Sequence, residues 1–185
     1  MAAVNIEPDP LPASVVEQSV FEGLFHNLLQ PDAEFAAELK AAGYDLAAPL
    51  PKYSGKVFQD CVHIARRRAY PDLSPEEAER ALGKRFLDGY LSTIIGKMIA
   101  AMLPIIGTAG ALKRYARLYK SGSTGTVVIS EPLGERAWRI GLRDQYMNTD
   151  FNHGLLESAM QHTGAQATVV VLSRSPHAAD YEVRW

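Results

Sequence analysis

Residues 90 to 106 read Tyr-Leu-Ser-Thr-Ile-Ile-Gly-Lys-Met-Ile-Ala-Ala-Met-Leu-Pro-Ile-Ile, and Lys97 carries the one charge in this stretch. A helix that is apolar on nearly all sides must be covered by protein or by lipid. A membrane span needs about 20 uninterrupted apolar residues, whereas Lys97, Pro104 and Gly107 interrupt this one. We therefore expect the central helix of a soluble domain, with small and flexible side chains that leave room for a guest molecule.

The sequence before this stretch predicts a helical region. Residues 1–13 contain three prolines and read as a flexible lead-in. Ser14 and Glu17 form a capping box ahead of helically spaced apolar residues, and the string Ser74-Pro75-Glu76-Glu77 is the clearest helix start in the chain. The expected helices cover residues 15–29, 33–42, 55–69, 75 onward to 106 with a possible break at Gly83, and 111–119.

The hydrophobic period changes after residue 121. Residues 126–130 are β-branched, residues 136–142 and 180–185 alternate, and residues 167–172 give a strong strand signal. Residues 151–163, which lie between the strands at 136–142 and 167–172, have a helical period. We therefore expect an α+β fold in one domain, residues 14–185, because four strands need a helical layer to cover their apolar face. Its helical part is residues 14–120, and its strand–strand–helix–strand–strand part is residues 121–185.

Composition excludes several classes of protein. The 185 residues are 47% hydrophobic and 22% charged, with a net charge of −2, which is typical of a globular domain without a field that attracts nucleic acid or anionic lipid. The single cysteine excludes an internal disulfide and a multi-cysteine zinc site. The N-terminus lacks the basic start and apolar run of a signal peptide. We expect a cytoplasmic protein with no nucleic acid and no membrane among its partners.

No set of residues predicts catalysis or metal binding. Cys61 and His63 point about 200° apart on a helix, so they cannot pair locally, and a buried thiol is the better interpretation. The five histidines form no spaced metal pattern, although His26 stands out as an internal polar group. We therefore expect no catalytic residue and no metal site, and a protein that is not an enzyme.

Two other motifs have simple structural interpretations. Residues 122–125 are glycine-rich but precede a strand instead of opening a helix, which favours a connector over a phosphate loop. The basic clusters at 66–68 and 113–120 are not interleaved with aromatic residues in a basic domain, which favours solvated helix faces.

Several strings together resemble a paralogous family of myxobacterial proteins of unknown function. The resemblance covers most of the chain and implies no activity. The strings are Phe21-Glu22-Gly23-Leu24-Phe25, Ala65-Arg66-Arg67, Tyr70-Pro71-Asp72-Leu73-Ser74-Pro75-Glu76-Glu77-Ala78, Leu82-Gly83 and Asp88-Gly89-Tyr90.

The layout is also similar to the haem–nitric oxide/oxygen-binding (H-NOX) fold and its relatives, the four-vinyl-reductase domains and the TRAPP-like vesicle-tethering subunits. This similarity implies a four-stranded antiparallel sheet with a crossing helix. Haem-binding members use a histidine on the helix before the sheet and a Tyr-x-Ser-x-Arg motif that holds the propionates. Here residues 111–120 contain no histidine, and the nearest string, Tyr146-Met147-Asn148-Thr149-Asp150, ends in an acid. His26 and His153 do not match the ligand position, so we expect no haem and no other cofactor.

The hypothesis for function is a haem-independent sensor or ligand-binding module. An apolar small molecule would bind between the long apolar helix and the sheet and shift the packing of helices against sheet. A signalling partner protein would then recognise an altered surface around Arg114, Tyr115 and Arg117. Two alternatives stay open: a scaffold with a filled core that works as a homodimer, and a haem-based gas sensor. The expected ligand-binding residues are Phe21, Phe25, Tyr90, Ile94, Met98, Met102, Ile105, Trp138 and Phe151.

Overall fold

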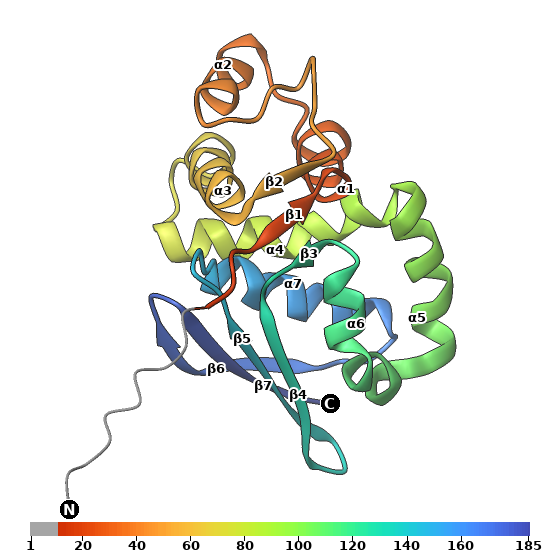
Figure 1. Cartoon of the computed structure of the whole chain (residues 1–185). Helices are drawn as coiled ribbons and strands as arrows, with labels where there is room; N and C mark the ends of the chain where they lie inside the picture. Colours follow the sequence, from red (N-terminus) through yellow and green to blue (C-terminus); the bar gives the residue numbers. More distant parts are fainter. Residues whose placement is uncertain (1–10) are drawn as a thin grey trace, which may run out of the picture.

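The computed structural model describes residues 11–185 (Figure 1). Most of the expected lead-in therefore lies outside the described residues. The helices are α1 (Gln18–Phe21), the π-helix η1 (Glu22–Leu29), α2 (Ala33–Ala41), α3 (Gly55–Ala69), α4 (Pro75–Leu91), α5 (Ile94–Lys113), α6 (Tyr115–Lys120) and α7 (Thr149–His162). The strands are β1 (Val15–Glu17), β2 (Lys52–Ser54), β3 (Ser123–Thr124), β4 (Val127–Gly134), β5 (Ala137–Arg143), β6 (Thr168–Ser175) and β7 (Ala178–Arg184).

The segment after Ser14 begins as a strand and not as a helix. β1 pairs with β2 on one side and with β3 on the other, so a small three-stranded sheet joins segments that are far apart in the sequence. The Ser14 hydroxyl donates to Asp144 at 2.9 Å instead of capping a helix. The expected capping box is therefore wrong here, because a long-range hydrogen bond replaces the local one.

The starts of two other helices, α2 and α4, follow local capping rules, and the predicted start at Ser74 is confirmed. The Asp32 side chain accepts a hydrogen bond from the backbone N–H of Phe35 at the start of α2. Ser74 and Glu77 form a complete capping box at the start of α4, with Pro75 at the first helical position. These local rules succeed because the groups involved lie within one helical turn.

α4 crosses the molecule between the upper helices and α7 (Figure 1). Gly83 does not break α4, as the sequence suggested it could, but lies at the crossing with α7. A side chain at Gly83 would overlap the carbonyl oxygen of Phe151, and one at Gly154 would overlap that of Arg80. Paired glycines therefore let the two helix backbones touch, which places α7 directly between α4 and the larger sheet.

The larger sheet has the strand order β4-β5-β7-β6, and all its neighbouring pairs are antiparallel. Its inner face packs against α7 through Ile140, Leu142 and Tyr181, together with Leu156 and Met160 of the helix. The expected α+β class, with a four-stranded antiparallel sheet and a crossing helix, is confirmed. A second apolar cluster fills the upper part around Phe21, Phe25 and Tyr44.

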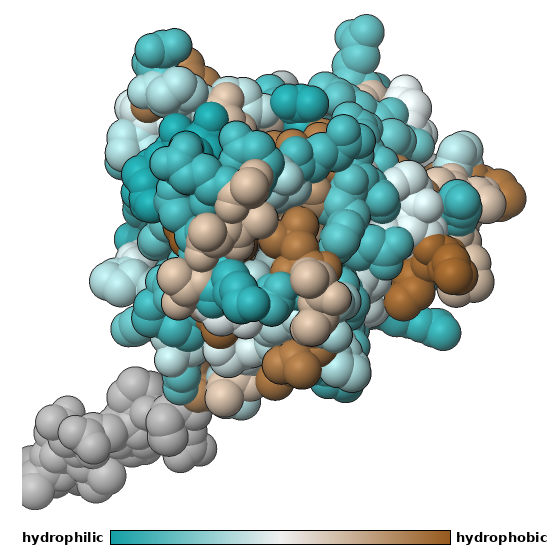
Figure 2. All heavy atoms as spheres, turned by 90° about the horizontal axis from the view of Figure 1, so that it is seen from above, coloured by the Kyte–Doolittle hydropathy of each residue, from teal (hydrophilic) through white to brown (hydrophobic). Residues whose placement is uncertain are grey.

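α5 lies at the edge of the molecule and is not wrapped by protein (Figure 1). Ile94 and Ile105 are each 84% exposed and Met98 is 66% exposed, and hydrophobic atoms gather at this edge in Figure 2. Gly107 has φ 62° and ψ −177°, which interrupts the helical backbone beyond Pro104. The expected central helix is therefore a kinked surface helix, and only its inward side contacts the rest of the protein.

By length and composition α5 is also the one helix among residues 11–185 that could cross a membrane. Of its most apolar window, 17% is buried. The apolar composition of this segment therefore does not reflect a position in the core.

Candidate functional site

A cavity of about 140 Å³ lies among α4, α5, α6, α7 and β1. No residue of the four-stranded sheet lines it, because α7 separates the cavity from that sheet. Its location therefore differs from the expected one between the apolar helix and the sheet. The apolar part of the wall includes Val16, Val20, Phe58, Phe86, Leu87, Tyr90, Ile99, Leu103, Leu118, Phe151, Leu155, Ala159 and Met160.

The loop between β5 and α7 supplies polar side chains to the same wall. Asp144 is buried and accepts hydrogen bonds from Ser14 at 2.9 Å, Thr126 at 2.5 Å and the backbone N–H of Tyr146 at 2.8 Å. Three donors satisfy this carboxylate, as a buried charge requires. Asp144 therefore fixes the loop against β1 and leaves little capacity for a ligand.

Two buried polar atoms of lining residues have no hydrogen-bond partner among the described residues. They are the hydroxyl of Tyr115 on α6 and the side-chain oxygen of Asn148. Both residues are buried. A buried polar atom without a partner costs about 1–3 kcal/mol, so native proteins retain few of them. Two of the five described residues with such an atom line this cavity.

The cavity wall is electrically neutral apart from Asp144. Burial raises the pKa of Tyr115 well above its ordinary value. Burial, then the nearby Asp144 charge, also raises the pKa of Tyr119, whose hydroxyl donates to Asn152 at 3.4 Å. Both phenols therefore stay protonated at neutral pH and act as hydrogen-bonding groups without charge.

The structure brings two of the nine expected ligand-binding residues to this cavity. Tyr90 of α4 and Phe151 of α7 line it. The others lie elsewhere. Phe21 and Phe25 pack in the upper apolar cluster, and Trp138 packs against the sheet cluster. On α5, Met102 is partly buried but outside the lining, whereas Ile94, Met98 and Ile105 are exposed to solvent.

The expected lining of α5 is wrong for its three exposed side chains because the opposite side of the helix faces inward. Ile99 and Leu103 take that place. Tyr115 is also corrected: it was expected on a recognition surface, and it is buried at the cavity, whereas Arg114 and Arg117 are exposed. Asn148 lay in the string that was compared with the haem motif, but no sequence pattern assigned it a role in binding.

Cys61 is a buried thiol, and burial raises its pKa to about 12. The neutral thiol is a poor nucleophile. His63 instead lies 3.5 Å from the Glu79 carboxylate. His153 is buried, and its Nε2 pairs with the carbonyl oxygen of Val169 at 2.9 Å. These residues therefore have structural partners and do not form a joint site.

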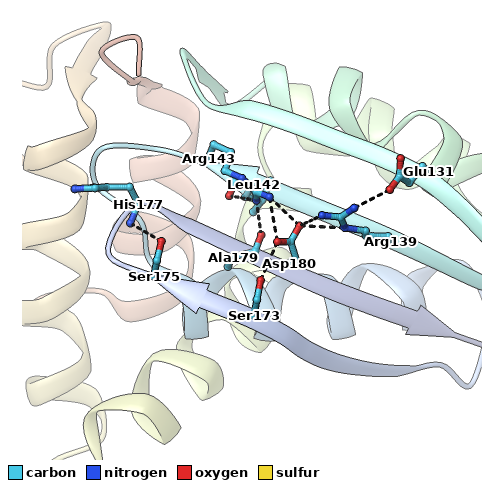
Figure 3. Close-up of polar contacts among 9 residues, drawn as sticks. All are labelled: Glu131, Arg139, Leu142, Arg143, Ser173, Ser175, His177, Ala179 and Asp180. Atoms are coloured by element: carbon cyan, nitrogen blue, oxygen red, sulfur yellow. Dashed lines mark hydrogen bonds and ion pairs between the residues drawn. The ribbon is translucent and has the colours of Figure 1, made fainter. Parts of the chain in front are cut away.

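The outer face of the sheet carries a separate polar cluster, shown in Figure 3. Asp180 accepts hydrogen bonds from Arg139 at 3.0 Å, from Arg143 at 3.0 Å and from Ser173 at 2.8 Å. Gly141 makes room for this cluster, since a Cβ there would lie 2.8 Å from the Asp180 carboxylate. Every member is paired within the cluster, so its role is to hold β5, β6 and β7 together.

Residues 14–185 match the family described as "Protein of unknown function (DUF2378)". The chain belongs to the DUF2378 family. This membership assigns no activity to the cavity. No curated protein sequence matches the chain.

Solved structures show which fold this DUF2378 protein has. A double variant of the Tt H-NOX protein superposes with a TM-score of 0.69 at 11% identity, over 91% of this chain and 94% of that chain. An unliganded Fe(II) H-NOX variant from K. algicida gives 0.58 at 12% identity, over 91% and 95%. An oxygen-binding H-NOX domain related to soluble guanylate cyclases gives 0.56 at 12% identity, over 90% and 91%. The fold is H-NOX-like, and at these identities the likeness shows the fold alone.

The cavity wall does not fit haem, the group that the H-NOX fold implies. Among the described residues the lining contains no histidine, lysine or arginine, and its one charged side chain is the acid Asp144. Two propionates would face that acid without a cation. Tyr115 is a poor iron ligand because burial holds its phenol in the protonated form. Asp150, at the position of the clamping arginine, is paired with Arg174 at 3.0 Å.

Proposed function

We propose that this DUF2378 protein is a haem-independent sensor that binds a small neutral molecule in the cavity beside α4, α5, α6 and α7. The observation that carries the proposal is that two residues of a mostly apolar lining, Tyr115 and Asn148, each keep a buried polar atom without a hydrogen-bond partner. An empty apolar cavity would need no polar group, whereas a binding site uses a few placed polar groups to fix its ligand.

The size of the cavity restricts the ligand. An engineered apolar cavity of about 150 Å³ binds benzene, and the cavity here is about 140 Å³. A single ring or a short aliphatic chain of similar size therefore fits. The Asn148 oxygen accepts a hydrogen bond, and the Tyr115 hydroxyl both donates and accepts. The ligand would thus carry a hydroxyl or N–H group on a compact apolar body.

The charge of the wall excludes ionic ligands from the proposal. An anion would approach Asp144 without a compensating cation, and Asp144 already accepts three hydrogen bonds, so a cation would gain little from it. The free-energy cost of moving a charged ligand out of water would then be uncompensated. Phenol combines the required size, neutrality and donor, and it serves as the probe.

The signal would be a change in packing that the ligand stabilises. α5, α6 and α7 all contribute to the wall, so a guest that contacts all three favours one arrangement of these helices. Exposed Arg114 and Arg117 lie on or beside α6 and would present that arrangement to a partner protein. Partner recognition, dimer formation and cytoplasmic location stay predictions.

The decisive experiment compares phenol binding by the parent protein and Tyr115→Phe, using calorimetry and thermal unfolding. Without ligand, the variant should be as stable as the parent or more stable, because it removes an unpaired buried hydroxyl. With phenol, it should bind roughly fivefold more weakly, since one hydrogen bond contributes about 1 kcal/mol. This opposite response of stability and affinity distinguishes a binding group from a structural one.

A second variant tests the cavity itself. Ala159→Leu places a larger apolar side chain on the lining and should reduce phenol binding while unfolding stays cooperative. Leu133→Ala, on the exposed β4–β5 hairpin, is the matched control and should leave binding unchanged. Phenol binding that is equal in the parent, Tyr115→Phe and Ala159→Leu would refute the proposal, and so would a Soret band in the purified protein.

A further inference from the structure

We propose that the outward face of α5 is a docking surface for an anionic lipid membrane. The proposal does not depend on a ligand in the cavity, because the cavity lies on the other side of the same helix, at Ile99 and Leu103. It departs from the expectation of no membrane partner, since that expectation took this helix to be covered by protein.

The outward face forms one continuous stripe, here named the α5 stripe. Ile94 and Ile105 are its most exposed members, and exposed residues recur between them at helical spacing of three or four positions. Large apolar side chains in such a row form a contiguous exposed patch. Patches of this kind commonly mark interaction surfaces, whereas single exposed apolar residues do not. Its members are Ile94, Lys97, Met98, Ala101, Pro104 and Ile105.

The charge around the α5 stripe identifies the occupant. Residues 89–130 contain no aspartate or glutamate, although the whole chain has a net charge of −2. The cations of this segment are exposed, and none forms an ion pair with another described residue. An apolar helix face on a segment that carries exposed, unpaired cations complements acyl chains below anionic headgroups. The cations are Lys97, Lys113, Arg114, Arg117 and Lys120.

The geometry fits a helix that lies on a membrane and not one that crosses it. Gly107 interrupts the helical backbone, and Lys97 stands within the α5 stripe, where its long side chain would reach back to the headgroups. Ile99 and Leu103 hold the inward side on the domain. Inserting only the outward side therefore leaves the fold intact, as an interfacial helix requires.

A sedimentation experiment with lipid vesicles tests the proposal. The full chain is mixed with vesicles of phosphatidylcholine alone or of phosphatidylcholine and phosphatidylserine in equal parts. We expect binding to the anionic vesicles that weakens steeply with added salt, because salt screens the attraction to the cations. We expect little binding to pure phosphatidylcholine.

Paired variants separate the two parts of the surface. Ile94→Gln with Ile105→Gln should reduce binding at least tenfold, since each isoleucine would be buried in the acyl boundary. Lys113→Gln with Arg117→Gln should reduce it about 25-fold, at about fivefold for each cation. The matched controls are Leu133→Gln and Arg136→Gln on the exposed β4–β5 hairpin, and they should bind as the parent does.

All these variants replace exposed side chains, so circular dichroism should show an unchanged fold. Absence of binding to the anionic vesicles overturns the proposal, and so does an equal loss in the hairpin controls. A dimer that the α5 variants dissociate, without vesicle binding, would assign the α5 stripe to a second copy of the chain and would also overturn it.

Discussion

Asp180 illustrates how a single buried charge is held in this protein. Its side chain is 11% exposed and lies between Arg139 and Arg143 (Figure 3). Burial opposes its ionisation, but the hydrogen bonds from Ser173, Arg143 and Arg139 outweigh burial, and the pKa of Asp180 falls below its ordinary value. The ionised form is therefore the one that stabilises the sheet.

Asp180→Asn should lower the free energy of unfolding by about 2 kcal/mol at neutral pH, because two arginines lose their common partner. A carboxylate with a depressed pKa contributes stability above its unfolded pKa and loses it as the pH falls through the folded pKa. The difference from the parent should therefore shrink as the pH falls below about 4. Urea unfolding at neutral and acidic pH measures this, and a constant difference would contradict it.

Cys61 should resist alkylation in the folded protein. Burial raises the pKa of its thiol to about 12, so the thiolate fraction near pH 8 is lower by about a thousandfold than for a free cysteine. Labelling with iodoacetamide, followed by mass spectrometry, should be slow in buffer and fast in urea. Fast labelling in buffer would show that the thiol is accessible and would reopen its interpretation as a nucleophile.

At the scale of elements, glycines decide how close the helices can approach. Gly154 of α7 faces the backbone of α4. A Cβ at Gly154 would overlap the Arg80 carbonyl oxygen and lie 2.7 Å from the backbone nitrogen of Lys84. Backbone atoms cannot move aside as a flexible side chain can. The α4–α7 crossing therefore depends on the absence of side chains at this position.

Gly154→Ala should destabilise the protein by about 1–3 kcal/mol through overpacking, although alanine is the better helix former by about 1 kcal/mol. The control is Gly134→Ala, where a Cβ meets no atom within 4 Å, and its effect should stay within about 0.5 kcal/mol. Thermal and urea unfolding measure both. A stabilising Gly154→Ala would mean that the two helices can separate at little cost.

At the scale of the whole molecule, α7 joins the two apolar clusters. Phe151 packs in the upper cluster, whereas Leu156 and Met160 pack in the sheet cluster. One helix that is required by both clusters couples their unfolding. The expectation of a single domain, residues 14–185, stays a prediction that this coupling supports.

We expect one cooperative unfolding transition. Trp138 and Trp185 both pack with the sheet cluster, so tryptophan fluorescence reports on the sheet, while far-UV circular dichroism is dominated by the helices. The two signals should change at the same denaturant concentration, as two-state unfolding requires. Separate midpoints would divide the chain into two units and contradict the prediction.

The sequence by itself determined the fold class and much of the local structure, although not the strand after Ser14. The start of α4 followed from Ser74, and the change of hydrophobic period after residue 121 predicted four strands with a helix between the second and the third. These features depend on neighbours within one helical turn or one strand, so the order of residues contains them. Family resemblance and the H-NOX-like layout were likewise present in the sequence.

Only the tertiary structure decided which side of α5 faces inward and where the cavity lies. Apolar composition sets how much surface must be covered, but not by what, so Ile94 and Ile105 were assigned to a pocket that they do not reach. Tyr115 and Asn148 became a candidate site because packing placed both residues at one cavity and left one polar atom of each without a partner. Hydrogen-bond satisfaction depends on residues far apart in the chain, and no local pattern records it.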